Sequence, residues 1–285
     1  MCGLFGVLAP TSINRREATR LRDEFLYLGQ LAEERGLAAA GFAELLPNGE
    51  QRLRRRIGRF SELAATLDDS QPAEGYGWIG HTRWPTQGAV TLPNTSPLRA
   101  GPVLGTHNGD IDTTTLPTQP VPDHRREGTD SHALLAALAA LRVGRGYPER
   151  VATLLAQVQG RAALVWRDAR DPRGRVWLAR SGLSPLAVAT DTTTGAIWWA
   201  SNPDWLRELG LHPFLLPHGS LWSIRPTATR AELTLLTTWV PTVRHSDLRL
   251  LDTAVWRNFT DADRDVDLAL LTYRLAPRQP ERLEV

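Results

Sequence analysis

The chain has 285 residues, 42% hydrophobic and 22% charged, with a formal net charge of +2. This composition is typical of a globular protein with enough core for one large domain or two small ones, and no apolar run is long enough for a transmembrane helix. Cys2 is the only cysteine, which excludes an internal disulfide and a cysteine-based metal cluster. All 33 basic residues are arginine, which excludes Schiff-base, pyridoxal-phosphate and Walker-type lysine chemistry.

The chain begins Met1-Cys2-Gly3, and the apolar residues 4–7 predict a buried strand. Removal of Met1 would make Cys2 the first residue, with a thiol and a free α-amine on the same residue. An α-amine has an ordinary pKa of about 8, so it can accept the thiol proton and activate a nucleophile. A lone cysteine is more often simply small core filler, so the rest of the chain has to decide between the two readings.

Helices and strands follow in a regular order. Asn14 to Glu17 has the capping-box pattern that opens a helix, and Gly36 ends it. Asn48-Gly49 joins two alternating runs and predicts a hairpin. Further strands are predicted over residues 76–83, 102–106, 162–167, 175–180, 186–190, 196–200, 220–224 and 233–240. Further helices are predicted over residues 129–141, 148–158, 203–209 and 263–275, and residues 61–67 predict a short helix or a turn. The pattern predicts stacked sheets with helices outside.

The sequence does not support binding of nucleic acid, a metal or a cofactor, nor secretion. The arginines between residues 52 and 59 alternate with Leu53 and Ile57, which indicates a strand with one solvated face and not a nucleic-acid-binding surface. The histidines show no ligand spacing, so no metal site is expected. No cofactor is expected either. The chain does not start with a basic segment followed by a long apolar stretch, so no secretory signal is expected and the expected location is the cytoplasm.

Three polar clusters interrupt the apolar pattern. They are Gly80-His81-Thr82-Arg83-Trp84-Pro85-Thr86, His107-Asn108-Gly109-Asp110-Ile111 and Thr129-Asp130-Ser131. Each has an ordinary structural explanation by itself: a surface ion pair for Arg83, a turn at Asn108-Gly109 and a helix N-cap at Asp130. Together with Met1-Cys2-Gly3-Leu4-Phe5-Gly6, and in this order and spacing, they resemble the class II glutamine amidotransferase domain. This family is a branch of the N-terminal-nucleophile hydrolases.

The resemblance covers residues 2–224 and includes a weaker match at Leu178-Ala179-Arg180, Pro185-Leu186 and Ala200-Ser201. It implies an α+β fold, the four-layer αββα sandwich of the N-terminal-nucleophile hydrolases. It also implies hydrolysis of L-glutamine to glutamate and ammonia through a γ-glutamyl thioester on Cys2, with the α-amine as the base. In that scheme His81 and His107 are structural.

The resemblance assigns roles to the other matched residues. The side-chain amide of Asn108 and the backbone N–H of Gly109 would hold the oxyanion of the tetrahedral intermediate. Arg83 would bind the α-carboxylate of glutamine, and Asp130 its ammonium group. Three further residues would shape the substrate pocket, namely Trp84, Thr86 and Gln87. Gln87 stands where the family often has histidine, and the family's His-Pro-His arrangement is missing after Asn94.

Residues 225–285 form an expected C-terminal extension that is too short for the acceptor domains found in many relatives. We therefore expect a glutaminase that works with a separate acceptor-modifying synthase or ligase, or as a homo-oligomer, with the extension contributing a contact surface. Two alternatives stay open: another N-terminal-nucleophile amidohydrolase, or a non-catalytic scaffold or regulatory homologue. Retention of Met1 would favour the second, because it would bury the α-amine in a peptide bond.

Overall fold

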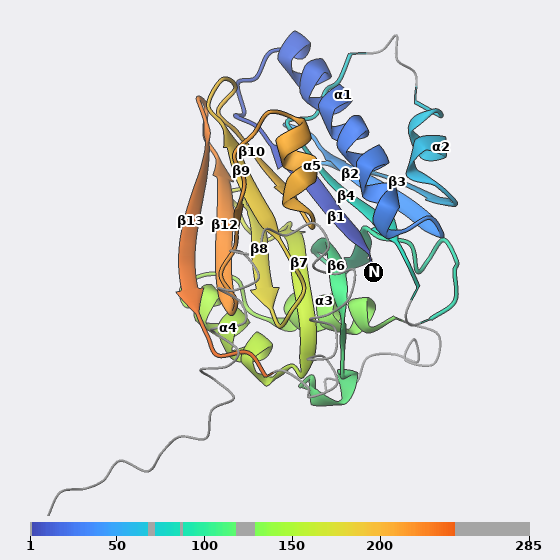
Figure 1. Ribbon diagram of the computed structural model, residues 1–285. Coiled ribbons are helices and arrows are strands. Elements are labelled where there is room, and N and C mark those ends of the chain that lie inside the picture. Colours follow the sequence, from blue (N-terminus) through green and yellow to red (C-terminus); the bar gives the residue numbers. More distant parts are fainter. Residues whose placement is uncertain (1, 68–71, 86–87, 118–128, 243–285) are drawn as a thin grey trace, which may run out of the picture.

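The computed structural model describes residues 2–67, 72–85, 88–117 and 129–242. Within these residues the chain forms four layers, in which two antiparallel sheets pack face to face and helices cover their outer faces (Figure 1). This arrangement confirms the predicted α+β sandwich of αββα type. The helices of the described part include none with the length and apolar character needed to span a membrane.

The first sheet is built around the N-terminal strand. Among the described residues its seven strands are, in order, β11 (Phe214–Leu215), β9 (Ala187–Asp191), β10 (Ala196–Ala200), β1 (Gly3–Leu8), β4 (Gly77–Arg83), β2 (Ala39–Leu45) and β3 (Gln51–Ile57). β2 and β3 form the predicted hairpin, and Gly49 in its turn has a φ of 88°, a conformation that favours glycine. β1 pairs with β10 on one edge and β4 on the other. The backbone that follows Cys2 is therefore fixed on both sides.

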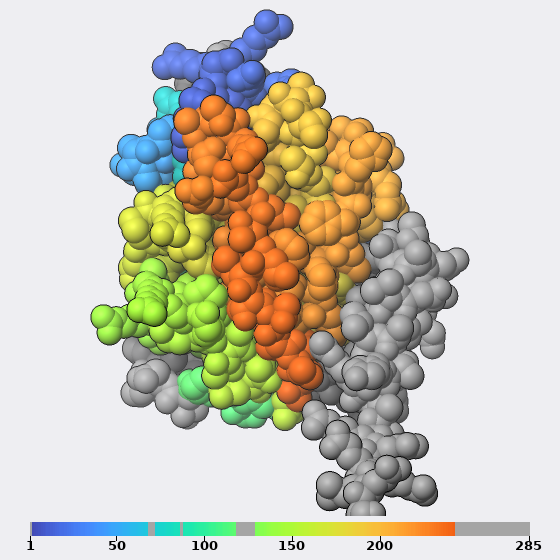
Figure 2. Space-filling view, turned by 90° about the vertical axis from the view of Figure 1, so that its left-hand side faces the viewer, coloured from blue at the N-terminus to red at the C-terminus, as the bar shows by residue number. Residues whose placement is uncertain are grey.

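The second sheet carries the His107–Ile111 cluster. Its six strands in the described part are, in order, β13 (Ala231–Thr238), β12 (Ser220–Pro226), β8 (Val176–Ser181), β7 (Gly160–Asp168), β6 (Val103–Ile111) and β5 (Leu98–Ala100). β6 is longer than the predicted strand over residues 102–106, because it stays paired with β7 as far as Ile111. The boundary expected at residue 224 falls inside β12, and β13 pairs along that strand and lies on the surface (dark orange in Figure 2).

Helices cover the outer faces of both sheets. In the described residues they are α1 (Arg15–Leu31), η1 (Ala32–Arg35), α2 (Phe60–Ala64), η2 (Thr113–Thr115), α3 (Asp130–Ala140), α4 (Tyr147–Gln157) and α5 (Pro203–Glu208), where η marks a 3-10 helix. α1, α2 and α5 pack on the first sheet, and α3 and α4 pack on the second. The capping box predicted at Asn14 is present at the start of α1. The helix predicted over residues 263–275 lies outside the described residues.

The alternation of side chains along each strand decides which residues face the space between the sheets. In β1, Phe5 and Val7 pack beneath α1, whereas Leu4 and Leu8 pack between the sheets. In β4, Ile79 also packs between the sheets. The same alternation directs the later odd-numbered residues of β4 toward the second sheet, and those residues belong to the polar cluster.

Candidate active site

Cys2 directly precedes β1. Arg35, the last residue of η1, donates from Nε to the carbonyl oxygen of Cys2 over 3.1 Å and so holds the backbone of this residue in place. The thiol donates to the carbonyl oxygen of Trp84 at 3.5 Å. Burial raises the pKa of the Cys2 thiol above its ordinary value, although a backbone hydrogen bond with Trp84 and the charges of Arg83 and Arg35 act the other way. The thiol is therefore mostly protonated at neutral pH, and its activation needs a base.

Arg83 is the last residue of β4, and its side chain is buried beside the loop that follows the strand. Its guanidinium donates from Nη1 to the carbonyl oxygen of Ala89 over 2.9 Å and from Nη2 to that of Gly88 over 3.2 Å. These bonds aim a fixed positive charge into the site. Trp84 comes next and is 55% exposed. Thr86 and Gln87, the other predicted residues of this loop, lie outside the described residues.

Beyond Gly105, the edge of β6 that faces away from β7 has no paired strand within the described residues. Asp112 N–H donates to Gln159 O, so Asp112 occupies a hydrogen-bonded position next to β7. Gly109 lies three positions before Asp112 and opposite Ala162. In an antiparallel pair the hydrogen-bonded positions alternate, so the N–H groups of Gly109 and Ile111 point away from β7. The bond from Ile111 N–H to the Asp130 carboxylate, 3.2 Å long, confirms this orientation. The Gly109 N–H therefore points to the same side as Asp130.

Glycine is required at position 109 for steric reasons. A Cβ there would overlap with the carbonyl oxygen of Arg161 and with Nε2 of His107. Both contacts are shorter than any that real Cβ atoms show, so a side chain would push β6 away from its neighbours. The neighbouring Asn108 is on the opposite face of the strand, faces the first sheet and is only 1% exposed.

Asp130 opens α3, and its carboxylate is held by the backbone. Oδ2 accepts from Ile111 N–H, and Oδ1 accepts from Ser131 N–H at 2.9 Å. The N-cap of the helix is Thr129, whose Oγ accepts from His132 N–H. Asp130 is therefore not the N-cap residue, the ordinary role that its sequence position suggests. It is 6% exposed, and its side chain faces the pocket.

Two buried histidines flank these groups. His81 Nε2 lies 3.2 Å from the carbonyl oxygen of His107 and bridges the two sheets, and burial lowers the pKa of His81 to about 3. His107 Nδ1 lies 3.0 Å from the Ser131 hydroxyl and 3.9 Å from the Asp130 carboxylate, and burial lowers its pKa as well. Both rings are therefore neutral at pH 7, which agrees with structural roles.

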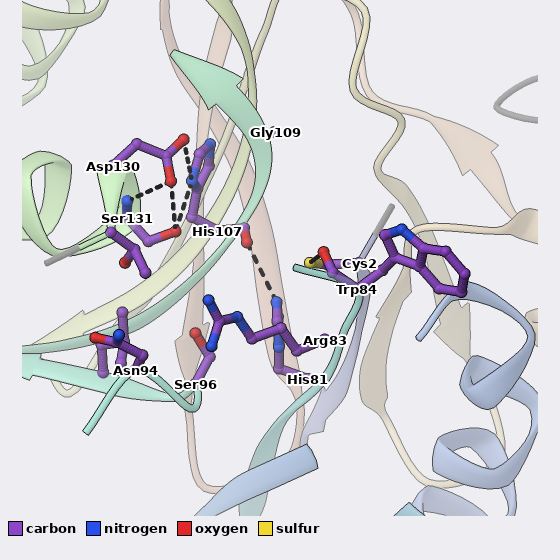
Figure 3. A pocket seen from close by; sticks show the side chains of 12 residues that line it. Cys2, His81, Arg83, Trp84, Asn94, Ser96, His107, Gly109, Asp130 and Ser131 are labelled. Carbon is purple, nitrogen blue, oxygen red and sulfur yellow. Dashed lines mark hydrogen bonds and ion pairs between the residues drawn. The ribbon is translucent and has the colours of Figure 1, made fainter. Parts of the chain in front are cut away.

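These segments meet at one pocket (Figure 3). Its lining includes five of the predicted site residues, which are Cys2, Arg83, Trp84, Gly109 and Asp130. The pocket has a volume of about 20 Å³, enough for about one water molecule. Asn108 does not line the pocket in this conformation, and the described residues contain no group of three or more side chains that could hold a metal ion.

Several curated proteins are similar to the chain in sequence. No protein-family model matches it. The glutamine–fructose-6-phosphate aminotransferase (isomerizing) of Mycolicibacterium smegmatis is 33% identical over 202 residues, which are 66% of this chain and 31% of that protein. The aminotransferase of the same name from Shewanella oneidensis is 32% identical over 66% of this chain and 30% of its own length. That from Pseudomonas putida is 42% identical over 113 residues, 39% of this chain and 17% of its own. The chain thus spans less than a third of these relatives.

Solved structures share the fold. A glutamine phosphoribosylpyrophosphate amidotransferase from Bacillus subtilis superposes with a TM-score of 0.62 at 17% identity, over 84% of this chain and 50% of that one. A class II glutamine aminotransferase domain protein from Silicibacter pomeroyi gives a TM-score of 0.50 at 12% identity, over 82% of this chain and 99% of its own. The chain contains a class II glutamine amidotransferase domain. The resemblance inferred from the four sequence motifs is thereby confirmed.

Arg35 is the residue of this amidotransferase domain that sequence reasoning missed. In the sequence it precedes Gly36 at the end of an amphipathic helix, where an arginine is ordinarily solvated. In the structure it is 9% exposed, and burial lowers its pKa to about 10, so it stays charged beside Cys2. The only available signal was the pair Glu34-Arg35 directly before a helix-ending glycine, which is too common to indicate a site.

Proposed function

We propose that this amidotransferase domain hydrolyses L-glutamine to L-glutamate and ammonia through a γ-glutamyl thioester on Cys2. The observation that carries the proposal is the meeting of Cys2, Arg83, Gly109 and Asp130 at one pocket, although they lie on four separate segments of the chain. A nucleophile, a fixed cation, a free backbone donor and a fixed carboxylate are the groups that hydrolysis of an α-amino acid amide requires.

The reaction begins with the activation of Cys2. Once Met1 is removed, the α-amine takes the thiol proton, and the thiolate attacks the side-chain amide carbon of glutamine. The protonated α-amine then returns this proton to the leaving nitrogen, and ammonia departs as the thioester forms. A water molecule, deprotonated by the same amine, cleaves the thioester and releases glutamate with a free thiol.

The tetrahedral intermediate carries a negative oxygen that needs donors. The N–H of Gly109 is directed away from β7 and toward the pocket, which supports its assignment to this oxygen. We assign the second bond to the amide of Asn108, which faces the first sheet from the adjacent position of β6. Loss of one such donor typically lowers the rate by about 10²–10³-fold.

The charges of the pocket favour an α-amino acid over other amides. The planar guanidinium of Arg83 can donate two parallel bonds to a carboxylate. The carboxylate of Asp130 accepts from an ammonium group. An N-terminal-nucleophile amidohydrolase for a neutral amide would have no use for this pair, so we place that alternative second.

Glutaminase assays on the wild type and on Cys2→Ala test the proposal directly. The variant is expected to lose all turnover, and a diazoketone analogue of glutamine should add a single adduct to the wild type at Cys2. Intact mass of the purified protein reports whether Met1 is absent, as the mechanism requires. Unchanged turnover in Cys2→Ala would refute the mechanism. A protein that retains Met1 in its native host and hydrolyses no glutamine would support the non-catalytic alternative.

We further propose that the ammonia passes to a separate acceptor-modifying synthase or ligase in the cytoplasm. Ammonia released into water at pH 7 becomes mostly ammonium and loses its nucleophilicity, so direct transfer is advantageous. The names of the relatives include an acceptor, fructose 6-phosphate, for those proteins alone. Affinity purification from cytoplasmic extract should recover the partner enzyme or a homo-oligomer. Recovery of a monomer only, with full glutaminase turnover, would argue against this transfer.

A further inference from the structure

Ser201 lies at the point where the chain leaves the first sheet. It follows β10, and its backbone N–H donates to the carbonyl oxygen of Leu4 in β1 over 2.8 Å. In a regular ladder Leu4 N–H would bond in return to the Ser201 carbonyl oxygen. It donates instead to the Ser201 side-chain Oγ, over 2.9 Å. The hydroxyl therefore completes the pairing of β1 two residues after Cys2, while the backbone turns toward α5.

The same oxygen contacts the second sheet. Nδ2 of Asn108 lies 3.5 Å from Ser201 Oγ, and both residues are almost fully buried, at 1% and 0% exposed. A separation of 3.5 Å is at the long end for a hydrogen bond, so the contact orients the amide without binding it strongly. Ser201 Oγ has two acceptor lone pairs. One accepts from Leu4 N–H and the other accepts from Asn108.

We propose that Ser201 is a positioning residue that orients the Asn108 amide toward the oxyanion of the reaction. The inference rests on the proposed glutaminase function. The amide nitrogen carries two hydrogens, and one directed at Ser201 leaves the other to donate to substrate. Because Ser201 is bonded to β1, this arrangement couples the position of the oxyanion donor to that of the nucleophile. Small errors in such positions lower catalytic rates strongly.

The turn that carries Ser201 is also held by hydrogen bonds to η1, the 3-10 helix that contacts Cys2. The side chain of the next residue, Asn202, donates to the Glu34 carboxylate over 2.8 Å, and Trp205 Nε1 donates to the same oxygen over 2.9 Å. Glu34 precedes Arg35, which bonds to the carbonyl oxygen of Cys2. The corner after β10 is therefore fixed on one side to β1 and on the other to η1, which makes its hydroxyl a rigid reference point.

Steady-state glutaminase kinetics of Ser201→Ala test the inference. We expect kcat to fall by about tenfold, as for loss of one hydrogen bond, with KM for glutamine unchanged, because Arg83 and Asp130 are untouched. Alkylation of Cys2 by iodoacetamide should keep its wild-type rate, since it needs no oxyanion donor. The decisive comparison is a double-mutant cycle: in an Asn108→Ala background, Ser201→Ala should have no further effect on kcat.

Ser184→Ala is the matched control. It removes another buried hydroxyl, 0% exposed, which has no hydrogen-bond partner within the described residues, and it should leave kcat unchanged. If Ser201→Ala does not fold, Ser201→Cys, whose side chain has the same shape but a somewhat larger and weaker acceptor atom, enters the same cycle. Equal effects of the Ser201 change with and without Asn108 would overturn the inference. If instead the proposed glutaminase function is wrong, the wild type itself will show no glutaminase activity that depends on Cys2.

Discussion

At the scale of single residues, the site depends on arginines that the fold has removed from water. Arg35 and Arg83 are 9% and 5% exposed. Arg35 donates to the carbonyl oxygen of Cys2, and Arg83 donates to those of Gly88 and Ala89 in the loop after β4. Burial of a cation is costly unless its donors are satisfied. The rigid fork of an arginine satisfies several acceptors at once, which the single ammonium group of lysine cannot do. The all-arginine composition therefore matters at these two positions.

Arg83→Lys tests this difference. We expect KM for glutamine to rise by about tenfold or more, because a point charge cannot reproduce the bidentate bond to the α-carboxylate. The value of kcat should change less, since the reacting amide lies at the other end of the substrate. Steady-state kinetics measure both constants. Arg99→Lys is the control, because Arg99 is exposed and bonds to Gln51 on the surface. A variant with the wild-type KM would remove Arg83 from the substrate site.

At the scale of elements, local sequence signals explain the positions of the helices. The Asn14 side chain accepts from Glu17 N–H over 2.9 Å, and the Glu17 carboxylate accepts from Asn14 N–H over 3.3 Å. These reciprocal bonds satisfy two donors that the first turn of α1 would otherwise leave free. The buried face of α1 then packs Leu21, Phe25 and Leu28 on the first sheet.

Asn14→Ala should therefore lower the free energy of unfolding by about 1 kcal/mol, because it removes the side-chain oxygen that accepts from Glu17 N–H, while the bond from the Asn14 backbone to Glu17 remains. Asn14→Ser keeps a side-chain acceptor and should lose much less. Urea denaturation at pH 7 measures both variants. Glutaminase activity should be unaffected in each, since the cap is remote from the pocket residues. An alanine variant as stable as the serine variant would show that the capping box contributes nothing to stability.

His81 joins an element of each sheet, and its titration should affect stability. The folded protein holds it neutral with a pKa of about 3, against 6.5 ordinarily. Between these values the unfolded chain binds a proton that the folded chain does not. The free energy of unfolding therefore falls as the pH drops from 6.5 toward 3, by up to about 1.4 kcal/mol per pH unit.

His81→Gln should make this pH dependence shallower, because glutamine has no proton to bind and its amide can still donate to the His107 carbonyl oxygen. Urea denaturation at several pH values between 4 and 7 measures the slope. His212→Gln, a change at an exposed histidine, is the control for the loss of a histidine elsewhere in the chain. If His81→Gln keeps the wild-type slope, His81 does not contribute to the pH dependence of the free energy of unfolding.

At the scale of the whole molecule, the alternating patterns and turn residues were sufficient to predict nearly every strand. The sequence does not predict β5 and β11, because they have three and two residues and are defined only by their pairing with β6 and β9. The predicted strand over residues 102–106 was too short, since His107-Asn108-Gly109-Asp110 looks like a turn when neighbours are unknown. Its pairing with β7 decides otherwise.

The site was predictable only where a motif marked it. Cys2, Arg83, Gly109 and Asp130 stand in motifs, and the structure places them together at one pocket. Arg35 and the hydroxyl of Ser201 act through contacts with the backbone of residues 2–4, which are distant in sequence. Such contacts arise from the packing of η1 and β10 against β1. Neither composition nor spacing records them, so sequence reasoning could not assign their roles.

The second sheet includes β13, so the chain beyond residue 224 contributes to the fold itself. Trp239 and Leu221 belong to the core beneath α4, and Leu236 packs against that core. Thr242 bonds from its hydroxyl to the carbonyl oxygen of Ala156 in α4. Removal of this segment would expose apolar surface of the second sheet and leave β12, cut at its end, as a new edge strand.

The contribution of residues 225–242 to stability can be measured with two truncated chains. The chain ending at residue 224 should lose about 3 kcal/mol or more in free energy of unfolding relative to the chain ending at residue 242, because Trp239 and Leu236 each bury apolar surface. Both lack residues 243–285, so the difference reports on residues 225–242 alone. Thermal unfolding and urea titration of the two proteins provide the comparison, and glutaminase activity should follow the folded fraction. Equal stability of the two chains would mean that the domain ends at 224 and that β13 is only an attached strand.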